Sequence, residues 1–363
     1  MYHRTNFIIN LALVLVVTAT ILGVFANNYL HIIRDAKSTE KRDLAACPTN
    51  YLEIKAIAAF EKCFDDNFSF RNKAIKEMSL AKLEVFDKPT LGNISKGKND
   101  WFYYNNAEYI EQVTGKRKYI ESEKTEIKEA LKSRKEFFET NKIDYQMLVV
   151  PSKLSIYPEN FDRPITVSDQ TILNEFQSMA KEVRFDALIL KSELLEQKNT
   201  EQVFHPNDSH WNYNGMIVAY AKLVERFDLV PVKDLTKVNY DHRGDIPFVL
   251  NVFDSYVDKN VDKYEPRKPT SKPELDYNTS YELPNGKKVE YQRWVNSNKN
   301  LPKLVLFGDS FSDIMRPLLA ENYSELYFYK TYKDFPRAEL ERIKPDKVIY
   351  VFNEFQLLDM PEF

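Results

Sequence analysis

The feature that most constrains the fold is an apolar run that ends in a glycine, an aspartate and a serine. Residues 304–312 read Leu-Val-Leu-Phe-Gly-Asp-Ser-Phe-Ser. A buried strand that stops at such a turn places a serine hydroxyl at the carboxyl edge of a sheet, where α/β enzymes present a nucleophile. We therefore expect Ser310 to lie at the carboxyl edge of a parallel sheet.

The segments on either side of this turn alternate between strand-like and helix-like patterns. Strands are expected at residues 145–150, 303–307, 325–329 and 346–352, and helices at 121–141, 213–227, 313–321 and 337–343. This alternation is typical of an α/β fold with a mostly parallel sheet covered by helices. Residues 229–302 are rich in Pro, Tyr, Asn and Lys, and we expect an irregular insertion there, with hairpins between Tyr281 and Trp294.

A second motif, about a hundred residues earlier, supplies the partners that a serine nucleophile needs. A serine hydroxyl reacts poorly unless a base takes its proton. Asp208 and His210 are two residues apart, so in an extended segment their side chains point the same way. A carboxylate that orients an imidazole is part of a Ser-His-Asp catalytic triad. We predict Ser310 as nucleophile, His210 as general base and Asp208 as the residue that orients it.

Other interpretations of these residues remain open. Ser310 and Asp208 could cap the helices that follow them, and His210 could be a structural histidine. His205, Asp208 and His210 could together bind zinc. That scheme gives the Gly-Asp-Ser turn no role, so we expect no metal. The sequence has no G-x-G-x-x-G motif, and we expect no cofactor.

The remaining site residues are predicted from their positions along the chain. The backbone N–H of Ser310 and one side-chain donor would stabilise an oxyanion. Arg316, six residues after Ser310, and Asn353, at the end of the last strand, are the candidate donors. Arg316 could equally be a solvated helix residue. We expect Trp211 to pack beside the site.

The amino terminus predicts a membrane anchor. No charged residue occurs between positions 5 and 30, and residues 7–26 are almost wholly apolar. Twenty helical residues span about 30 Å, the thickness of the hydrocarbon core of a bilayer. A cleavable signal is the alternative, because this stretch ends in Val-Phe-Ala. Residues 1–6 would be a cytoplasmic stub and residues 27–50 a juxtamembrane segment.

Charge and cysteine content limit the possible partners and compartments. The chain has 51 basic and 54 acidic residues, well mixed along its 363 positions, and a net charge of −3. No basic face is evident, so nucleic acid is not an expected partner. Cys47 and Cys63 are the only cysteines. They could form a disulfide, as even pairs in exported chains often do, or remain unpaired thiols.

Two motifs carry a family resemblance. Residues 308–312 resemble the nucleophile block of SGNH hydrolases, and residues 208–211 (Asp-Ser-His-Trp) resemble the D-x-H-W block of a permuted branch. That branch comprises the SGNH-hydrolase-like polysaccharide O-acetyltransferases of the alginate type, in which Asp and His precede Ser. Weaker likenesses to its motifs occur at residues 67–71, 98–103, 150–158, 243–246 and 344–354. The resemblance covers residues 50 to 360 and implies an SGNH-hydrolase-like catalytic domain over residues 51–363.

Some positions depart from the pattern of this branch. Its closing Glu-Arg pair reads Asn353-Glu354 here, and Asp100 stands where glycine is usual. The sequence ends at residue 363 without room for a carbohydrate-binding module, so it resembles the membrane-anchored members. Lys153 and Tyr157 lie in a turn that resembles the branch's "P-x-K … Y-P" motif. They are expected either to line the cleft or to pack a structural turn.

The resemblance implies O-acetylation of an extracytoplasmic polysaccharide through an acetyl-serine intermediate. It also implies a membrane-bound O-acyltransferase as the supplier of acetyl groups, and a catalytic domain in the periplasm or outside the cell. A literal positive-inside count would favour the opposite orientation, although large domains often translocate regardless of such charges. Two alternatives remain: a carbohydrate acetyl esterase, in which water takes the acetyl group, and a non-catalytic polysaccharide-binding or assembly component.

Overall fold

The computed structural model describes residues 43–48, 54–68, 70–89, 91–274, 279–283, 285–331 and 336–360, with isolated positions between 14 and 35. The stub at 1–6 lies outside the described residues, as do most of the predicted anchor at 7–26 and much of the segment at 27–50. Among the described residues, no helix combines the length and apolar character needed to cross a membrane. Contacts divide the chain into two units, one of residues Met1–Leu91 with Pro247–Ser255 and one of Gly92–Ile246 with Tyr256–Phe363.

The first unit contains helices α2 (Ile54–Asn67) and α3 (Arg71–Val85). A disulfide joins Cys63 of α2 to Cys47 across a Cα–Cα distance of 4.9 Å. The predicted catalytic domain began at residue 51, whereas the second unit begins at Gly92. Helix α3 buries only Ser79 and Leu83. A catalytic domain that begins at residue 51 stays a prediction.

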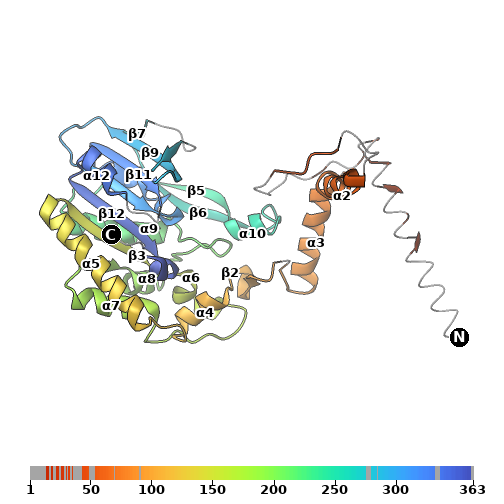
Figure 1. Ribbon diagram of the computed structural model, residues 1–363, viewed down its shortest axis with the longest axis horizontal. Coiled ribbons are helices and arrows are strands. Elements are labelled where there is room, and N and C mark those ends of the chain that lie inside the picture. Colours follow the sequence, from red (N-terminus) through yellow and green to blue (C-terminus); the bar gives the residue numbers. More distant parts are fainter. Residues whose placement is uncertain are drawn as a thin grey trace. The chain divides into compact units, whose positions relative to one another are not determined.

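The second unit is built on an eight-stranded mixed sheet in the order β4-β3-β12-β10-β11-β9-β7, with β8 paired to β9 (Figure 1). The strands are β3 (Asp144–Val150), β4 (Ala187–Ile189), β7 (Ser271–Pro273), β8 (Ser280–Glu282), β9 (Lys288–Asn296), β10 (Lys303–Gly308), β11 (Glu325–Lys330) and β12 (Lys347–Asn353). The run from β4 to β11 is parallel. The four strands predicted from the sequence are all present, and the three antiparallel strands, β7, β8 and β9, were not expected in this sheet.

Helices cover both faces of the sheet because its central strands are apolar on both sides. In β10, Leu304 and Leu306 pack into one core, whereas Val305 and Phe307 pack into the other. The first core also contains residues of α9 (Tyr213–Arg226) and α11 (Arg316–Ala320). The second core contains residues of α5 (Glu121–Asn141), α7 (Ile172–Glu182) and α12 (Arg337–Ile343).

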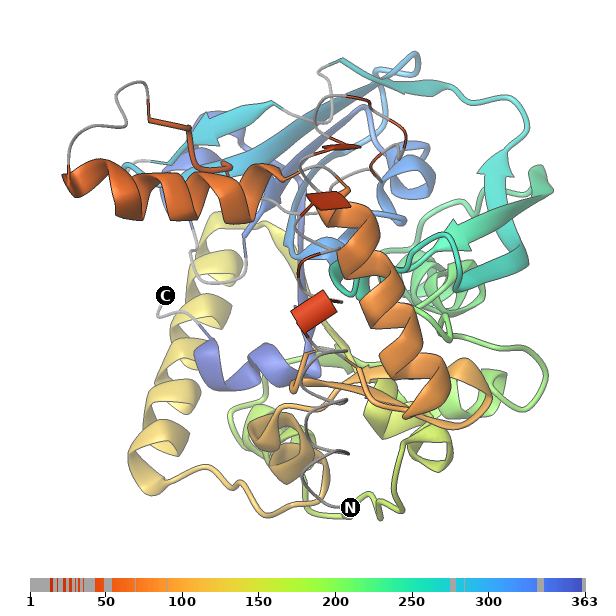
Figure 2. The same cartoon turned by 90° about the vertical axis from the view of Figure 1, so that its right-hand side faces the viewer.

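The described residues between 229 and 302 include regular strands, so the predicted irregular insertion is wrong in this respect. β5 (Leu235–Arg243) and β6 (Val257–Pro266) make an antiparallel two-stranded sheet of their own (Figures 1 and 2). The expected hairpin between Tyr281 and Trp294 is confirmed by the pairing of β8 with β9. β5 was missed because its side chains are exposed or half-buried along its whole length. Such a strand carries little of the apolar alternation on which strand prediction depends.

Short elements complete the second unit around the carboxyl edge of the sheet. They are β1 (Ile94–Lys96), η1 (Lys98–Asp100), β2 (Phe102–Tyr104), α4 (Ala107–Val113), α6 (Lys153–Ile156), η2 (Pro158–Asn160), α8 (Lys191–Gln197), η3 (Ser310–Ser312) and η4 (Glu354–Asp359). Helix α10 (Asp245–Val249) follows β5. The expected helix at 313–321 is shorter than predicted: α11 covers Arg316–Ala320, and residues 313–315 form a turn between η3 and α11.

Candidate active site

The turn after β10 presents Ser310 at the carboxyl edge of the sheet, where the sequence predicted it. Asp309 caps η3, and its Oδ1 accepts a hydrogen bond of 2.9 Å from the backbone N–H of Phe311. A Cβ atom on Gly308 would lie 3.0 Å from the side chain of Val351 and 3.1 Å from that of Ser312. Glycine therefore lets the turn pass close to β12 and expose the serine at its tip.

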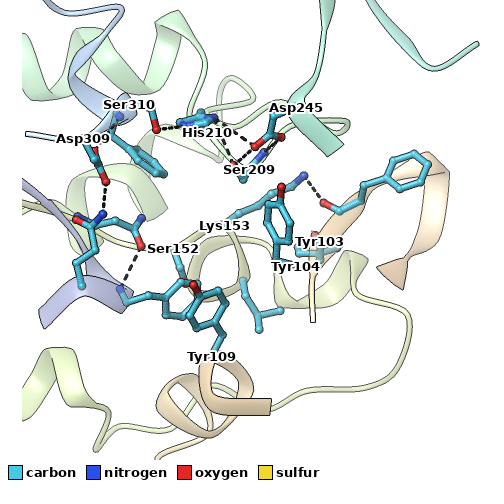
Figure 3. A pocket seen from close by; sticks show the side chains of 16 residues that line it. Tyr103, Tyr104, Tyr109, Ser152, Lys153, Ser209, His210, Asp245, Asp309 and Ser310 are labelled. Carbon is cyan, nitrogen blue, oxygen red and sulfur yellow. Dashed lines mark hydrogen bonds and ion pairs between the residues drawn. The ribbon is translucent and has the colours of Figure 1, made fainter. Parts of the chain in front are cut away.

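The three side chains predicted as a triad lie in one hydrogen-bonded row. The Nε2 atom of His210 is 2.6 Å from the Oγ of Ser310, and its Nδ1 is 2.6 Å from the Oδ1 of Asp208. Figure 3 shows the Ser310 hydroxyl turned toward the His210 ring. Trp211 is buried behind this row, and its indole N–H donates to the carbonyl of Phe311 at 3.0 Å. It thus packs beside the site, as expected.

Asp208 is held on both carboxylate oxygens. Oδ1 also accepts a 3.0 Å bond from the backbone N–H of His210, whereas Oδ2 is 2.7 Å from Nε2 of His242 and 3.1 Å from the backbone N of Asp245. Burial alone would raise the pKa of Asp208, but the hydrogen bonds from His210 and His242 outweigh it and lower the pKa well below its usual value. Asp208 is therefore a fixed, ionised carboxylate.

His210 carries a strongly perturbed pKa. Burial disfavours its charged form, but the hydrogen bond and charge of Asp208 and the carboxylates of Asp245 and Asp309 raise its pKa to about 9. Asp245 is half-buried, and its desolvation together with the charge of Asp208 raises its pKa to about 6. Its carboxylate accepts hydrogen bonds from the backbone N–H of Ser209 at 2.9 Å and from the Ser209 hydroxyl at 2.5 Å.

Ser310 opens into a cleft of about 280 Å³ (Figure 3). Part of its wall is aromatic, with Tyr104 from β2, Tyr109 from α4 and Phe355 from η4. The rings of Tyr109 and Phe355 stack with centroids 4.0 Å apart and planes 3° from parallel. The shape and lining suit a small acyl group or part of a sugar ring next to the Ser310 hydroxyl.

Two of the predicted accessory residues line this cleft. Lys153 is buried, and its Nζ donates to the carbonyl oxygens of Phe102, Pro206 and Asp208 at 2.7, 2.7 and 2.9 Å. Burial lowers the pKa of Lys153 to about 7. Asn353 also lines the cleft; its Oδ1 accepts from the backbone N–H of Phe355 at 3.1 Å, which leaves its Nδ2 group as a donor.

Arg316 and Tyr157 do not line the cleft, so both predictions are corrected. Arg316 lies in a different cavity of about 440 Å³, with ion pairs of 3.0 Å to Asp313 and 3.6 Å to Glu290. The turn η3 directs it away from Ser310, a change of direction that counting residues cannot reveal. The Tyr157 hydroxyl accepts from the backbone N–H of Val203 at 3.0 Å, and its ring packs against Trp101. This is the structural turn considered as the alternative.

Four residues that contact the site were not singled out from the sequence. His242, near the end of β5, and Asp245, at the start of α10, contact Asp208. Ser209 donates to Asp245, and Gln356 donates from Nε2 to Asp309 Oδ2 at 2.6 Å. His242 and Asp245 could have been found from the sequence. Histidines are few in this chain, and Asp245 lies in one of the motifs that resemble the family. Nothing in the sequence distinguishes Gln356 from other glutamines.

The alternative zinc set is not assembled as proposed. His205 pairs instead with Asp258, at 3.0 Å between Nδ1 and Oδ2, and its ring stacks on His242 with centroids 3.7 Å apart. The ligand atoms of Asp208, His210 and Asp245 do lie within 4.8 Å of one another. Both ring nitrogens of His210 already contact Asp208 or Ser310, so an ion bound there would have to break the triad row.

Gly244 is expected to be essential for this geometry. A Cβ atom there would lie 1.9 Å from the backbone oxygen of Asn207, so Gly244→Ala must displace the loop that carries Asp208 and His210. Misplacing catalytic groups by about 1 Å can cost about 10²-fold in rate, and we expect a loss of that order in ester turnover. Gly92→Ala is the matched control, because nothing lies within 4 Å of its Cβ position. Wild-type turnover in Gly244→Ala would show that the loop tolerates the shift.

The fold and the serine–histidine–aspartate row define an SGNH-hydrolase-like α/β protein, and comparison with known proteins identifies its family. A family model described as "SGNH hydrolase-like domain, acetyltransferase AlgX" matches residues 94–324. The chain belongs to this family of SGNH-hydrolase-like acetyltransferase domains, the alginate type that its motifs resemble.

Individual relatives are distant. "Probable alginate O-acetylase AlgJ" of Azotobacter vinelandii is 25% identical over 174 residues, which cover 47% of this chain and 43% of that protein. Among solved structures, Bacillus cereus PatB1 matches 73% of this chain and 96% of its own with a TM-score of 0.52 and 14% identity. The O-acetyltransferase domain of Pseudomonas putida AlgJ matches 73% and 92% with a TM-score of 0.46 and 17% identity. The likeness to PatB1 supports the fold alone.

Proposed function

We propose that this protein is a polysaccharide O-acetyltransferase that carries the acetyl group on Ser310. The observation that carries the proposal is the row of hydrogen bonds from Asp208 through His210 to Ser310, which ends in a partly aromatic cleft. Membership of an acetyltransferase family supports acetyl as the transferred group. A relative named for alginate O-acetylation supports a polysaccharide as the acceptor.

In the first half-reaction, the Oγ of Ser310 attacks the acetyl carbonyl of a donor ester while Nε2 of His210 takes the hydroxyl proton. The negative charge that develops on the carbonyl oxygen would be stabilised by the backbone N–H of Ser310 and by Nδ2 of Asn353. His210 then returns its proton to the departing alcohol, and the acetyl group remains on Ser310. Asp208 keeps Nδ1 of His210 protonated, so that Nε2 is free to act as the base.

In the second half-reaction, a sugar hydroxyl replaces the donor alcohol. Nε2 of His210 takes the proton of that hydroxyl as its oxygen attacks the acetyl-Ser310 carbonyl. When the tetrahedral intermediate collapses, the bond to Oγ breaks and the proton on His210 passes to Ser310. The products are an O-acetylated sugar and the free enzyme. If water enters in place of the sugar, the same steps release acetate, and the protein would be an esterase.

Transfer and hydrolysis predict different products. A bound sugar hydroxyl can outcompete bulk water because a well-oriented group can reach an effective concentration of about 10⁵ M or more. We expect the full chain, given p-nitrophenyl acetate and an oligosaccharide, to produce acetylated sugar and to consume donor faster than without acceptor. Mass spectrometry of the sugar and the release of p-nitrophenol measure the two effects. If free acetate is the sole product with every acceptor tried, the esterase function replaces the one proposed here.

We further propose that residues 7–26 anchor the protein in the cell membrane, with the second unit in the periplasm or outside the cell. A membrane-bound O-acyltransferase would supply the acetyl groups that are transferred to Ser310. A reporter fused after Phe363 is expected to be active only if it is of the type that requires export. Activity of a reporter that works solely in the cytoplasm would contradict this topology and an exported polysaccharide acceptor.

A further inference from the structure

We propose that the acceptor sugar bound in the Ser310 cleft is uncharged, so that the enzyme acetylates a neutral glycan in preference to a polyuronate. This inference rests on the proposed transferase function and narrows its substrate class. It follows from the charged side chains that line the cleft and from the hydrogen bonds that these side chains already make within the protein.

The cleft offers no free cation to a substrate carboxylate among the described residues that line it. The basic side chains of its lining are Lys153 and His210. The ammonium group of Lys153 has three N–H donors, and the carbonyls of Phe102, Pro206 and Asp208 accept all three. Lys153 is therefore a buried structural lysine that ties three chain segments together, and it has no donor left for a ligand.

His210 cannot supply the missing positive charge at the moment of transfer. To take the proton of the acceptor hydroxyl, its Nε2 must be unprotonated when the sugar binds to the acetyl-enzyme. The ring is then neutral, and its other nitrogen faces Asp208 at 2.6 Å. A sugar carboxylate would gain no attraction from this histidine in the reactive state.

The other charged groups of the cleft are acidic. Asp245 and Asp309 line it, and Asp208 is directly behind the His210 ring. The oxygens of Asp309 accept from the backbone N–H of Phe311 and from Gln356, and those of Asp245 accept from Ser209. These donors lower the pKa of both carboxyl groups, but burial outweighs them. It raises the pKa of Asp245 to about 6, still below neutral pH, and raises that of Asp309 above its ordinary value. A uronate would face like charges in a partly desolvated site, and the oxyanion that forms during transfer would add another.

The aromatic side chains of the cleft suit a neutral ring. Tyr104, Tyr109 and Phe355 are half-buried in its wall, and Tyr109 and Phe355 stack face to face. Sugar rings pack their C–H faces on such surfaces by apolar contact, which needs no charge on the sugar. Figure 3 shows Tyr104 and Tyr109 among the side chains that line the cleft.

The test compares one oligosaccharide in two charge states. A β-1,4-linked oligouronate and its methyl ester have the same rings, linkages and hydroxyls but differ in charge. With p-nitrophenyl acetate and the full chain at neutral pH, we expect the methyl ester to be acetylated about tenfold or more faster than the acid form. A neutral β-1,4-glucan oligosaccharide should be used at a rate closer to that of the ester. Added salt should bring the acetylation rates of the ester and the acid form closer together, because it screens the repulsion between the sugar carboxylates and the acidic groups of the cleft.

A charge-adding variant gives an independent readout. Tyr109→Lys puts a cation in the cleft wall and should raise acetylation of the acid form relative to the ester. Ala107→Lys is the matched control, because it adds the same charge at an exposed position of α4 outside the cleft lining. It should leave the ratio unchanged. If Tyr109→Lys does not fold, the comparison of the ester and the acid form with the wild-type protein is sufficient to test the inference.

The possible failures are distinguishable. Acetylation of the acid form as fast as the ester, or faster, overturns this inference and leaves the proposed transferase function intact. Release of acetate with no acetylated sugar of either kind overturns transfer itself, and the inference with it.

Discussion

Ser310→Ala is expected to lower acyl turnover by about 10⁴-fold or more, and His210→Ala by a similar factor. Ser310 provides the oxygen that forms the acetyl-enzyme, and His210 Nε2, 2.6 Å away, is the base that activates it. Because members of a triad act as a unit, the double variant should be scarcely slower than either single one. The remaining rate would come from the oxyanion donors and from substrate binding.

Ester hydrolysis and sugar acetylation by purified full-length variants measure this effect. Ser312→Ala is the matched control, because its hydroxyl lies in the same turn but donates to the backbone carbonyl of Asp309. It should keep most of the activity. Thermal unfolding of each variant separates loss of chemistry from loss of structure. Turnover close to that of wild type in a folded Ser310→Ala protein would remove Ser310 from the mechanism.

Asp208→Asn is expected to be nearly as damaging, and also to change the pH dependence. An asparagine amide beside Nδ1 would favour the tautomer with its proton on Nε2, which cannot take the serine proton; rate losses of about 10⁴-fold are expected for such a change. Asp208 also contributes to raising the pKa of His210 to about 9. In wild type, kcat/KM should therefore rise with pH and level off above about pH 9, as His210 loses its proton.

The sign of the pH shift tests the electrostatic part of this account. Removing the Asp208 charge lowers the pKa of His210, so the acid limb of the residual activity in Asp208→Asn should move to lower pH. A pH profile of kcat/KM for both proteins measures it. Asp241→Asn, which removes an exposed carboxylate from β5, is the control and should leave the limb in place. If the acid limb of the kcat/KM profile stays at the same pH in Asp208→Asn, a group other than His210 controls the pH dependence.

The triad could be predicted from sequence because each part has a strong local signal. The strand, glycine and serine of β10 mark a nucleophile turn, and Asp208 and His210 are only two residues apart. Residues 208–210 form a bend and not the extended segment that was expected, and in this bend Asp208 Oδ1 contacts both the backbone N–H and Nδ1 of His210. In a sheet with parallel strands, ligands and catalytic groups gather at the carboxyl edge. The contact between His210 and Ser310 could therefore be predicted although about a hundred residues separate them in the sequence.

The remaining site residues depend on tertiary contacts that short-range patterns do not encode. His242 reaches Asp208 from a mostly exposed strand in the insertion expected to be irregular. Arg316 was predicted from its distance along the chain, but the turn η3 points it toward Glu290 and Asp313. Lys153 was expected at the cleft from its motif, yet its three hydrogen bonds to carbonyls, which give it a structural role there, were visible only in the fold.

The most direct test of the central claim is to trap the acetyl group on the enzyme. The full chain is mixed with p-nitrophenyl acetate, quenched in acid during turnover, digested and analysed by mass spectrometry. The account predicts one acetyl group on Ser310, formed at least as fast as the donor is consumed and lost when an acceptor oligosaccharide is added before the quench. Turnover with no acetyl group on Ser310, or with the acetyl group on another residue such as Lys153, would contradict it.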